Sequence, residues 1–458
     1  MERHIELGDV DANIQPQTST FYSRRRQVKR RRFQSDEYST RGGSNISGSL
    51  DGTPITQPLL LILRLLSYYK IQLFSVGPSQ TWNLRQTLGE GSTFSVDGAN
   101  LPIWRGLSDL RYRNLDLKGP KEKFYFNDHT QTKWDHNTLV AYKVLVSNKD
   151  MDRSMIIVDM ITELRVLCHP PLQNHPNIVR LLGVAWVREI DLGSTLTPAP
   201  NQSAEDFEMC NRPTVVVERA PYGSLLDFLR SDEFRATRSS LVAKVYLCLD
   251  VLNGITVRSS IIFPASIPKV ASDEKQALHA CDILHGDIKC ENALVFKTEN
   301  GTAENWRVKI SDFGHSILNM EGKTPDEFTR REVLGTDFYS PPELNDAEAI
   351  LEVANMKSVD IWCWGLLMWK VMIDGADYAY ADGPEINRDE MQTLREHDRM
   401  ATTAKDACEK YLNAHHSRES TGFSTILGVL LDALCPNASD RPNAPSLLSR
   451  LKRFSGEK

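Results

Sequence analysis

The chain has 458 residues, of which 41% are apolar and 25% charged, so it can form a two-lobed globular domain plus a tail. The net charge of −6 is too small to indicate bulk nucleic-acid binding. The eight cysteines include no CxxC pair and no His/Cys cluster, which argues against a zinc site or a disulfide framework and favours a reducing, intracellular compartment.

The N-terminal segment, from residue 1 to about 57, is rich in Ser, Thr, Gln, Gly and Arg and has no hydrophobic periodicity. Such a composition predicts disorder, and the polar start shows no secretory signal. A basic run at 24–32 has two interpretations that remain open: a signal for nuclear import or an acidic partner, or a solvated charged tail. We expect a cytoplasmic protein, with a nuclear location through 24–32 as the alternative.

An apolar run, LLLILRLL, follows at Leu59–Leu66 and continues to Phe74. Arg64 and Lys70 interrupt it, so it is too short and too charged to span a bilayer. We expect a helix packed on the folded body, with a membrane-surface helix as the alternative. Residues 1–79 are therefore assigned as a basic, mostly disordered tail with a short apolar helix.

The rest of the chain begins with strand patterns and ends with helical ones. Strands are predicted at 82–88, at 138–146, which is rich in β-branched residues, and at 214–220, 293–297 and 307–311, of which the last two form a hairpin. Helical spacing predicts helices at 155–168, at 240–256 and through most of the chain after Pro342, while Asp97–Asn137 is predicted to be a long loop. This order predicts an α+β fold with a small β-rich lobe, a larger helical lobe and a cleft between them.

The stretch LGEGSTFSV, Leu88–Val96, follows the first predicted strand. Gly89 and Gly91 let backbone N–H groups approach a phosphate closely, although a two-glycine hairpin is common on its own. Lys143 lies in the middle of the next strand, and Glu163 follows twenty residues later as the single Glu between residues 144 and 174. A carboxylate at that place can aim the ammonium group of Lys143 at phosphate oxygens.

Further motifs follow in a fixed order: HPNIVRLLG (175–183), VVVERAPYGSLLDFL (215–229), HGDIKCEN (285–292), SDFG (311–314), GTDFYSPPE (335–343), SVDIWCWG (358–365) and SDRP (439–442). From about Leu84 to Phe454 this series resembles a eukaryotic protein kinase. The resemblance implies the two-lobed kinase fold over residues 80–455, with an N-lobe at 80–219 and a C-lobe at 220–455. It also implies ATP and Mg²⁺ as cofactors and a protein as the substrate.

The resemblance also implies a role for each polar residue of the motifs. Asp287 would accept the proton of the substrate hydroxyl, and Lys289 would neutralise the migrating phosphoryl group. Asn292 and Asp312 would hold two Mg²⁺ ions. Lys143, positioned by Glu163, would hold the α and β phosphates.

The adenine pocket is implied in the same way. The carbonyl of Glu218 and the amide of Ala220 would bind adenine, and Val217 would close the back of the pocket. Apolar walls sandwich the ring in such pockets. The residues expected in this position are Leu88, Val96, Ala141 and Leu294.

Some residues bear on specificity and architecture. Lys289, together with Thr336, resembles the loop of Ser/Thr-specific kinases, so we expect transfer to Ser and Thr hydroxyls. Glu343 and Arg441 resemble a buried ion pair that anchors the activation segment, and Asp360 resembles an aspartate that holds the catalytic loop. The alternative is a pseudokinase scaffold, although the strand Lys and both Asp residues that such proteins lose are present. We expect a monomer without a specific nucleic-acid partner or a transmembrane segment.

Two substitutions depart from the family pattern. Phe94 stands where the third glycine of the glycine-rich loop is expected, or forms the loop tip with Ser95 in the glycine's place, so we expect a stiffer loop and weaker nucleotide binding. Gly286 replaces the Arg that often precedes the catalytic Asp (a non-RD loop), so no guanidinium is available there to bind a phosphate at Thr324 or Thr329.

An insert at 257–276 separates the helix that ends LDVLNGIT from the catalytic loop, and its Pro264 and Pro268 forbid a continuous helix. Deleting it places Val251, Ile255 and Leu278 at i, i+4 and i+7. Two interpretations remain open: a retained intron, since Val-Arg and Gln codons can match splice signals, or a true inserted loop.

Overall fold

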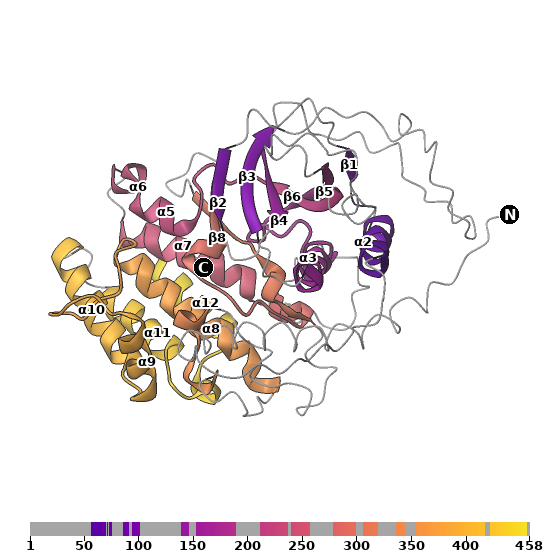
Figure 1. Cartoon of the computed structure of the whole chain (residues 1–458). Coiled ribbons are helices and arrows are strands. Elements are labelled where there is room, and N and C mark those ends of the chain that lie inside the picture. The colour runs from indigo at the N-terminus through magenta and orange to yellow at the C-terminus, as the bar shows by residue number, and fades with distance from the viewer. Residues whose placement is uncertain are drawn as a thin grey trace, which may run out of the picture.

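The computed structural model describes residues 56–69, 71, 73–75, 86–90, 94–100, 139–145, 153–188, 211–236, 240–256, 278–298, 306–318, 336–344, 353–416 and 422–455. In this part of the chain, a small lobe built on one sheet lies against a larger helical lobe (Figure 1). This is the α+β, two-lobed architecture that the strand-then-helix order predicts.

The sheet of the small lobe has six strands in the order β1-β5-β6-β4-β3-β2. All neighbours are antiparallel except β1 and β5, which are parallel. The strands are β1 (Leu73–Ser75), β2 (Gln86–Glu90), β3 (Phe94–Asn100), β4 (Leu139–Leu145), β5 (Leu181–Arg188) and β6 (Asn211–Glu218).

The strand prediction was confirmed at β4 and β6. Of the strand predicted at 82–88, residues 86–88 lie in β2, and 82–85 lie outside the described residues. The prediction was wrong for Asp97–Asn100, which were assigned to a loop because Asp, Gly and Asn favour turns. In the structure these residues continue β3 and pair with residues 139–142 of β4. Pairing with a neighbouring strand outweighs weak intrinsic preferences. The remainder of the predicted loop, 101–137, lies outside the described residues.

Two helices belong to the small lobe. Helix α3 (Arg153–Leu167) matches its prediction closely. Helix α2 (Thr56–Tyr68) contains the apolar run and packs against α3, as expected of a helix docked on the folded body. Strand β1 also joins the sheet, so the packed small lobe extends to residue 56. The boundary predicted at residue 80 was therefore wrong, because it left α2 and β1 in the tail. Within the described residues, no helix is long and apolar enough to cross a membrane.

The large lobe is organised around two central helices, α7 (Leu241–Ile255) and α8 (Val353–Met372). Trp362, Trp364 and Trp369 of α8 are fully buried. The remaining helices surround this pair (Figure 1): α5 (Leu225–Arg230), α6 (Asp232–Ala236), α9 (Arg388–Glu396), α10 (Met400–His415), α11 (Phe423–Ala433) and α12 (Ala444–Ser455).

Two short strand pairs and several 3₁₀ turns of the large lobe contain or flank the sequence motifs. The predicted hairpin is confirmed as β8 (Ala293–Lys297) and β9 (Trp306–Ile310), and β7 (Ile283–Leu284) pairs with β10 (Ile317–Leu318). The 3₁₀ turns are η4 (Leu278–Cys281), η5 (Cys290–Asn292), η6 (Phe313–His315), η9 (Asp337–Tyr339), η10 (Pro342–Leu344) and η12 (Ala438–Asp440).

Helix α7 delivers the catalytic loop. Ser240 caps its N-terminus and Thr256 its C-terminus, so the helix ends just before the insert, which lies outside the described residues. Val251, Ile255 and Leu278 are all fully buried in one core. The chain therefore resumes in η4 against the same core that α7 leaves.

The cysteines lie mostly in these cores. None of the seven described cysteines forms a disulfide, and five of them are buried. Burial raises the pKa of the Cys168 thiol to about 12, and it also raises the pKa values of Cys248 and Cys408. The described thiols in the two lobes are thus packing residues.

Candidate active site

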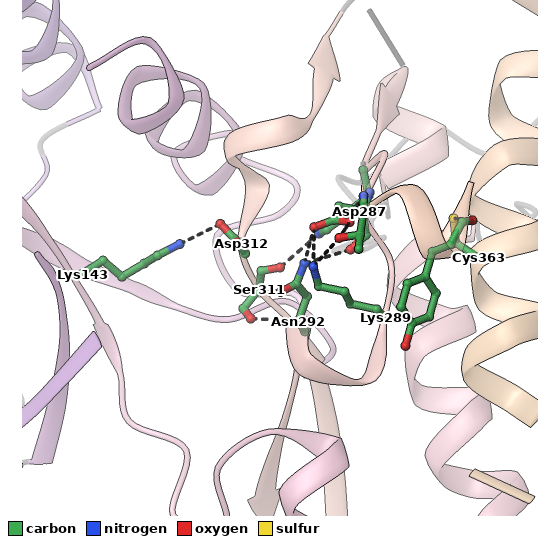
Figure 2. Close-up of polar contacts among 10 residues, drawn as sticks. Lys143, Asp287, Lys289, Asn292, Ser311, Asp312 and Cys363 are labelled. Atoms are coloured by element: carbon green, nitrogen blue, oxygen red, sulfur yellow. Dashed lines mark hydrogen bonds and ion pairs between the residues drawn. The ribbon is translucent and has the colours of Figure 1, made fainter. Parts of the chain in front are cut away.

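The small lobe and the large lobe meet at Lys143. Its Nζ lies 2.7 Å and 2.8 Å from the two carboxylate oxygens of Glu163 on α3, and 3.1 Å from Oδ1 of Asp312. Lys143 and Glu163 are buried, whereas the Asp312 side chain keeps 38% of its surface exposed. Figure 2 shows the Lys143 side chain reaching toward Asp312. One ammonium group therefore connects β4, α3 and the SDFG motif.

The surroundings favour the charged forms of Lys143 and Asp312, whereas burial raises the pKa of the Glu163 carboxyl. Burial alone would lower the pKa of Lys143, but the carboxylates of Asp312 and Glu163 outweigh it and raise the pKa. For Asp312, burial opposes ionisation, yet Lys143 and then His315 lower the pKa to about 2. Near neutral pH the site thus presents a fixed ammonium group beside an ionised carboxylate, which suits a phosphate and a cation respectively.

Strand register places the predicted adenine walls on the face that carries Lys143. Val96 of β3 lies directly opposite Lys143, and Gly89 of β2 lies opposite Val96. Ala141 is two residues from Lys143 and opposite Val217 of β6. Because side chains of directly paired residues, and of residues two apart, point to the same face, these positions form one surface.

Strand β6 leads into the segment that joins the two lobes, called the hinge below. The last side chain of β6 points to the other face of the sheet. Glu218 pairs with Val140, so its side chain lies on the opposite face of the sheet. Its Oε1 accepts hydrogen bonds from the Arg180 backbone N–H at 2.8 Å and from Lys309 Nζ at 2.6 Å. This contact joins the hinge to β9. The motifs do not predict it, because Lys309 belongs to none of them.

The segment after Ala220 runs beside β8. Tyr222 donates its backbone N–H to the carbonyl of Val295, and Val295 donates to Gly223. Ser224 forms a bridge with Leu294. Leu294 is therefore next to the hinge, and its expected contact with adenine stays a prediction. Leu88 is 38% exposed, and Gly91 lies outside the described residues.

Asp360 of α8 holds the backbone of the catalytic loop. Its carboxylate accepts the N–H of His285 at 3.0 Å and that of Gly286 at 2.9 Å, and His279 Nε2 lies 2.9 Å from the same group. All four residues are fully or mostly buried. Gly286 is held at φ +76°, and a Cβ there would meet the His315 carbonyl at 3.2 Å. Glycine at this position, where related kinases often have arginine, also adopts the left-handed backbone conformation without steric strain.

Asp287 lies at the centre of a dense hydrogen-bond network (Figure 2). Its Oδ1 accepts the backbone N–H and the hydroxyl of Thr336, both at 2.8 Å. Its Oδ2 accepts Lys289 Nζ at 2.9 Å and the Asn292 amide at 3.0 Å. Lys289 Nζ also donates to the Thr336 hydroxyl at 2.6 Å. The four residues form one cluster around a buried carboxylate.

The same network connects to the SDFG motif. The Ser311 N–H and hydroxyl both donate to the Asn292 carbonyl, at 2.8 Å and 2.9 Å. Burial would raise the pKa of Asp287, but the Lys289 ammonium and the hydrogen bonds from Lys289 and Thr336 outweigh it and lower the pKa. Asp287 is therefore ionised near neutral pH and can accept a proton.

The donor set fits Mg²⁺. Carboxylate and amide oxygens are the ligands that Mg²⁺ prefers, and nucleotide sites usually supply one or two protein ligands plus phosphates. The Asn292 amide nitrogen is used by Asp287, which leaves the amide oxygen for a cation, and the Asp312 carboxylate is partly exposed. Asn292 and Asp312 are thus the residues that would hold the ions.

The end of the activation segment is anchored from the large lobe. Arg441 donates two hydrogen bonds to the Glu343 carboxylate, at 2.6 Å and 2.7 Å, and its guanidinium lies 4.9 Å from the Trp362 ring centroid. Arg395 of α9 donates to the Ser340 carbonyl at 2.8 Å. A shallow depression lies between this segment, the catalytic loop and α8, lined in part by Asp287.

Comparison with known proteins agrees with this geometry. Residues 273–451 match the family model described as "Protein kinase domain". The matched part contains the catalytic loop, the SDFG motif and the anchored segment. The fold and the motifs agree with this match, so the part of the chain at 273–451 is a protein kinase domain.

Several curated relatives match at low identity. Calcium-dependent protein kinase 21 of Arabidopsis thaliana is 27% identical over 39% of this chain and 32% of its own length. Calcium-dependent protein kinase 9 of the same plant is 24% identical over 69% of this chain and 46% of its length. Fibroblast growth factor receptor 1 of Dugesia japonica is 25% identical over 47% of this chain and 19% of its length. The chain thus spans less than half the length of these relatives.

Proposed function

We propose that the chain is an active protein kinase that transfers the γ-phosphoryl group of ATP to Ser and Thr hydroxyls of proteins. The observation that carries the proposal is the cluster in which Thr336, Lys289 and Asn292 surround the Asp287 carboxylate. The second support is the contact of Lys143 with both Glu163 and Asp312.

The reaction follows from these positions. A substrate hydroxyl replaces the Thr336 hydroxyl at Asp287, loses its proton to the carboxylate, and attacks the γ-phosphorus while the bond to the β–γ bridging oxygen breaks. Lys289, 2.9 Å from Asp287, neutralises the charge on the migrating group. Lys143 holds the α and β phosphates. Mg²⁺, held by Asn292 and Asp312, supplies further charge neutralisation when bound.

The Ser/Thr preference is supported by the contact between Lys289 and Thr336 beside the base. Both plant relatives carry the name calcium-dependent protein kinase, whereas the planarian relative carries the name of a growth-factor receptor. The identity of the acceptor residue therefore needs a direct test.

The test uses the full chain with radiolabelled Mg-ATP and a peptide mixture containing Ser, Thr and Tyr acceptors. We expect label on Ser and Thr in acid hydrolysates and a loss of at least about 10²-fold in Asp287→Asn, the size typical of a lost general base. The matched control is Glu291→Gln, an exposed carboxylate in the same loop, which should retain activity.

The contrary outcomes are distinct. Label on Tyr would contradict the Ser/Thr assignment while leaving a protein kinase. ATP binding to folded protein without transfer would favour the pseudokinase scaffold. Equal rates for wild type and Asp287→Asn would show that the measured activity comes from a contaminant.

A further inference from the structure

Over residues 159–164, helix α3 is covered on every side. Six consecutive residues, Asp159–Leu164, are buried. Six residues make more than one full turn of about 3.6 residues, so no side of the helix faces water over this stretch. A helix that only lies on a sheet keeps a polar, exposed outer face. Something other than the sheet must therefore cover the outer side of α3.

The inner side of α3 faces the active site. Glu163 pairs with Lys143 there. One turn earlier, Asp159 lies close to η6: a Cβ added to Gly314 would be 3.2 Å from the Cβ of Asp159. The position of α3 thus fixes both the Lys143–Glu163 pair and the packing of the SDFG motif.

The outer side is covered by α2. Helix α2 packs against α3, and its Ile62 and Leu66, four residues apart on one face, are 0% and 1% exposed. Tyr68, on another face of α2, is 59% exposed. Figure 1 shows α2 alongside α3 on the side away from the large lobe.

Helix α2 is also tied to the sheet that carries Lys143. The Ile71 N–H donates to the Leu66 carbonyl at 2.8 Å, which closes the C-terminus of the helix. Two residues later β1 begins and pairs in parallel with Val184–Trp186 of β5. Since β5, β6 and β4 are neighbours, α2 is coupled to the strand of Lys143 on one side and to the helix of Glu163 on the other.

We propose that α2 acts as a clamp, meaning a helix of the same chain that holds α3 in the position where Glu163 contacts Lys143. Ile62 and Leu66 are positioning residues that act through α3. The inference deepens the proposed kinase function, on which it rests, by naming a control element of that site. The clamp lies outside residues 273–451, the part that matches the family model. Loss of the clamp lowers catalysis without touching a catalytic residue.

The first test does not depend on activity. Backbone hydrogen exchange is measured by mass spectrometry on the full chain as wild type, Leu66→Ala and the exposed control Tyr68→Ala. We expect exchange of the α3 amides to rise about tenfold or more in Leu66→Ala alone, with α7 unchanged. Unchanged α3 exchange in a folded Leu66→Ala would overturn the proposal. The result stands even if the wild type transfers no phosphate, so the two proposals fail separately.

The second test is a double-mutant cycle on kcat. Leu66→Ala should lower kcat about tenfold, and Leu66→Met, which restores volume, should recover it. In a Glu163→Gln background, Leu66→Ala should add no further loss, because the contact through which it acts is already gone. Additive losses would overturn the proposal. If Leu66→Ala does not fold, Ile62→Val removes one methyl group and carries the same comparison with a smaller effect.

Discussion

Gly286 shows how one residue joins regulation to backbone geometry. It lies at φ +76° and donates its N–H to Asp360. A side chain in this left-handed region costs about 1–2 kcal/mol. The absence of the arginine therefore has a local benefit, because the loop that carries Asp287 is held without strain.

Gly286→Ala should lower the free energy of unfolding by about 1–2 kcal/mol, because it adds a Cβ at positive φ and 3.2 Å from the His315 carbonyl. Chemical denaturation measures the change. The matched control is Gly428→Ala within α11, where the new Cβ meets only the flexible end of Arg450. That change should be neutral or stabilising, and equal losses at both positions would contradict the strain argument.

A double variant, Thr324→Ala/Thr329→Ala, should keep its activity. Both threonines lie outside the described residues, and residue 286 offers no guanidinium to a phosphate at either. Initial rates of phosphate transfer, with circular dichroism to check folding, measure the effect. A folded but inactive double variant would show that a phosphate in this segment is recognised by another cation.

The Asp312 carboxylate should make stability depend on pH in acid. Its pKa is about 2, below the usual 3.8, because Lys143 and His315 outweigh burial. A carboxylate with a lowered pKa stabilises the fold above about pH 4, and this contribution is lost as the pH falls toward 2. Urea denaturation across this window should show a smaller decline for Asp312→Asn than for wild type. Parallel curves would contradict the assignment.

At the scale of elements, the ion pair between Glu343 and Arg441 connects η10 to the turn before α12. The Arg441 side chain is fully buried and also donates to the carbonyls of Cys435, Ser358 and Pro436. Removing one partner leaves a buried charge without its counter-charge, which is far more damaging than losing an exposed pair.

Glu343→Gln should therefore lower the free energy of unfolding by about 3–5 kcal/mol. Asp432→Asn, which breaks the half-exposed pair with Arg450 in the same lobe, should lower it by about 1 kcal/mol or less. Thermal or urea denaturation compares the two variants. Losses of similar size would show that Glu343 is not energetically coupled to Arg441 as its burial indicates.

Elements with a strong local pattern were predictable from the sequence. The helix over 240–256 was predicted from its apolar periodicity, and the hairpin of β8 and β9 from two short strand patterns close together in the chain. Strand β5 was missed, since its residues were considered only as part of a motif. The order of β1 beside β5 was also missed, because pairing between segments about 110 residues apart leaves no local signal.

The candidate site also contains some features that the sequence predicts and others that it does not. Residues inside motifs, such as Asp287 and Lys143, were identified because those motifs resemble the motifs of protein kinases, and their roles stay predictions. The contact of Glu218 with Lys309 and that of Arg395 with Ser340 were not foreseen. Each depends on a long side chain that reaches a distant element, and nothing in the flanking sequence specifies where such a side chain ends.

For the whole molecule, deletion of 257–276 should leave a folded protein. Helix α7 ends with its own cap at Thr256, and Leu278 returns to the same core. Removing a loop of this length should raise the free energy of unfolding by roughly 1–2 kcal/mol through the loop-closure entropy. Urea denaturation measures it, and a Gly/Ser segment of equal length is the control. A deletion variant that loses stability would show that the insert is part of the fold.

The origin of the insert has its own measurement. If 257–276 is a retained intron, sequencing of the transcripts should show the dominant message without these twenty codons. A dominant message that contains them would contradict the intron interpretation and leave a true loop between α7 and η4.

The buried cysteines give the chain a set of internal probes. Cys168 follows α3 in the small lobe, while Cys248 and Cys408 lie in the large lobe, and their raised pKa values keep the thiols protonated. An alkylating reagent can reach them only when the surrounding structure opens. Pulse labelling followed by peptide mass analysis therefore times the opening of each lobe separately in one sample, without any added fluorophore or substitution.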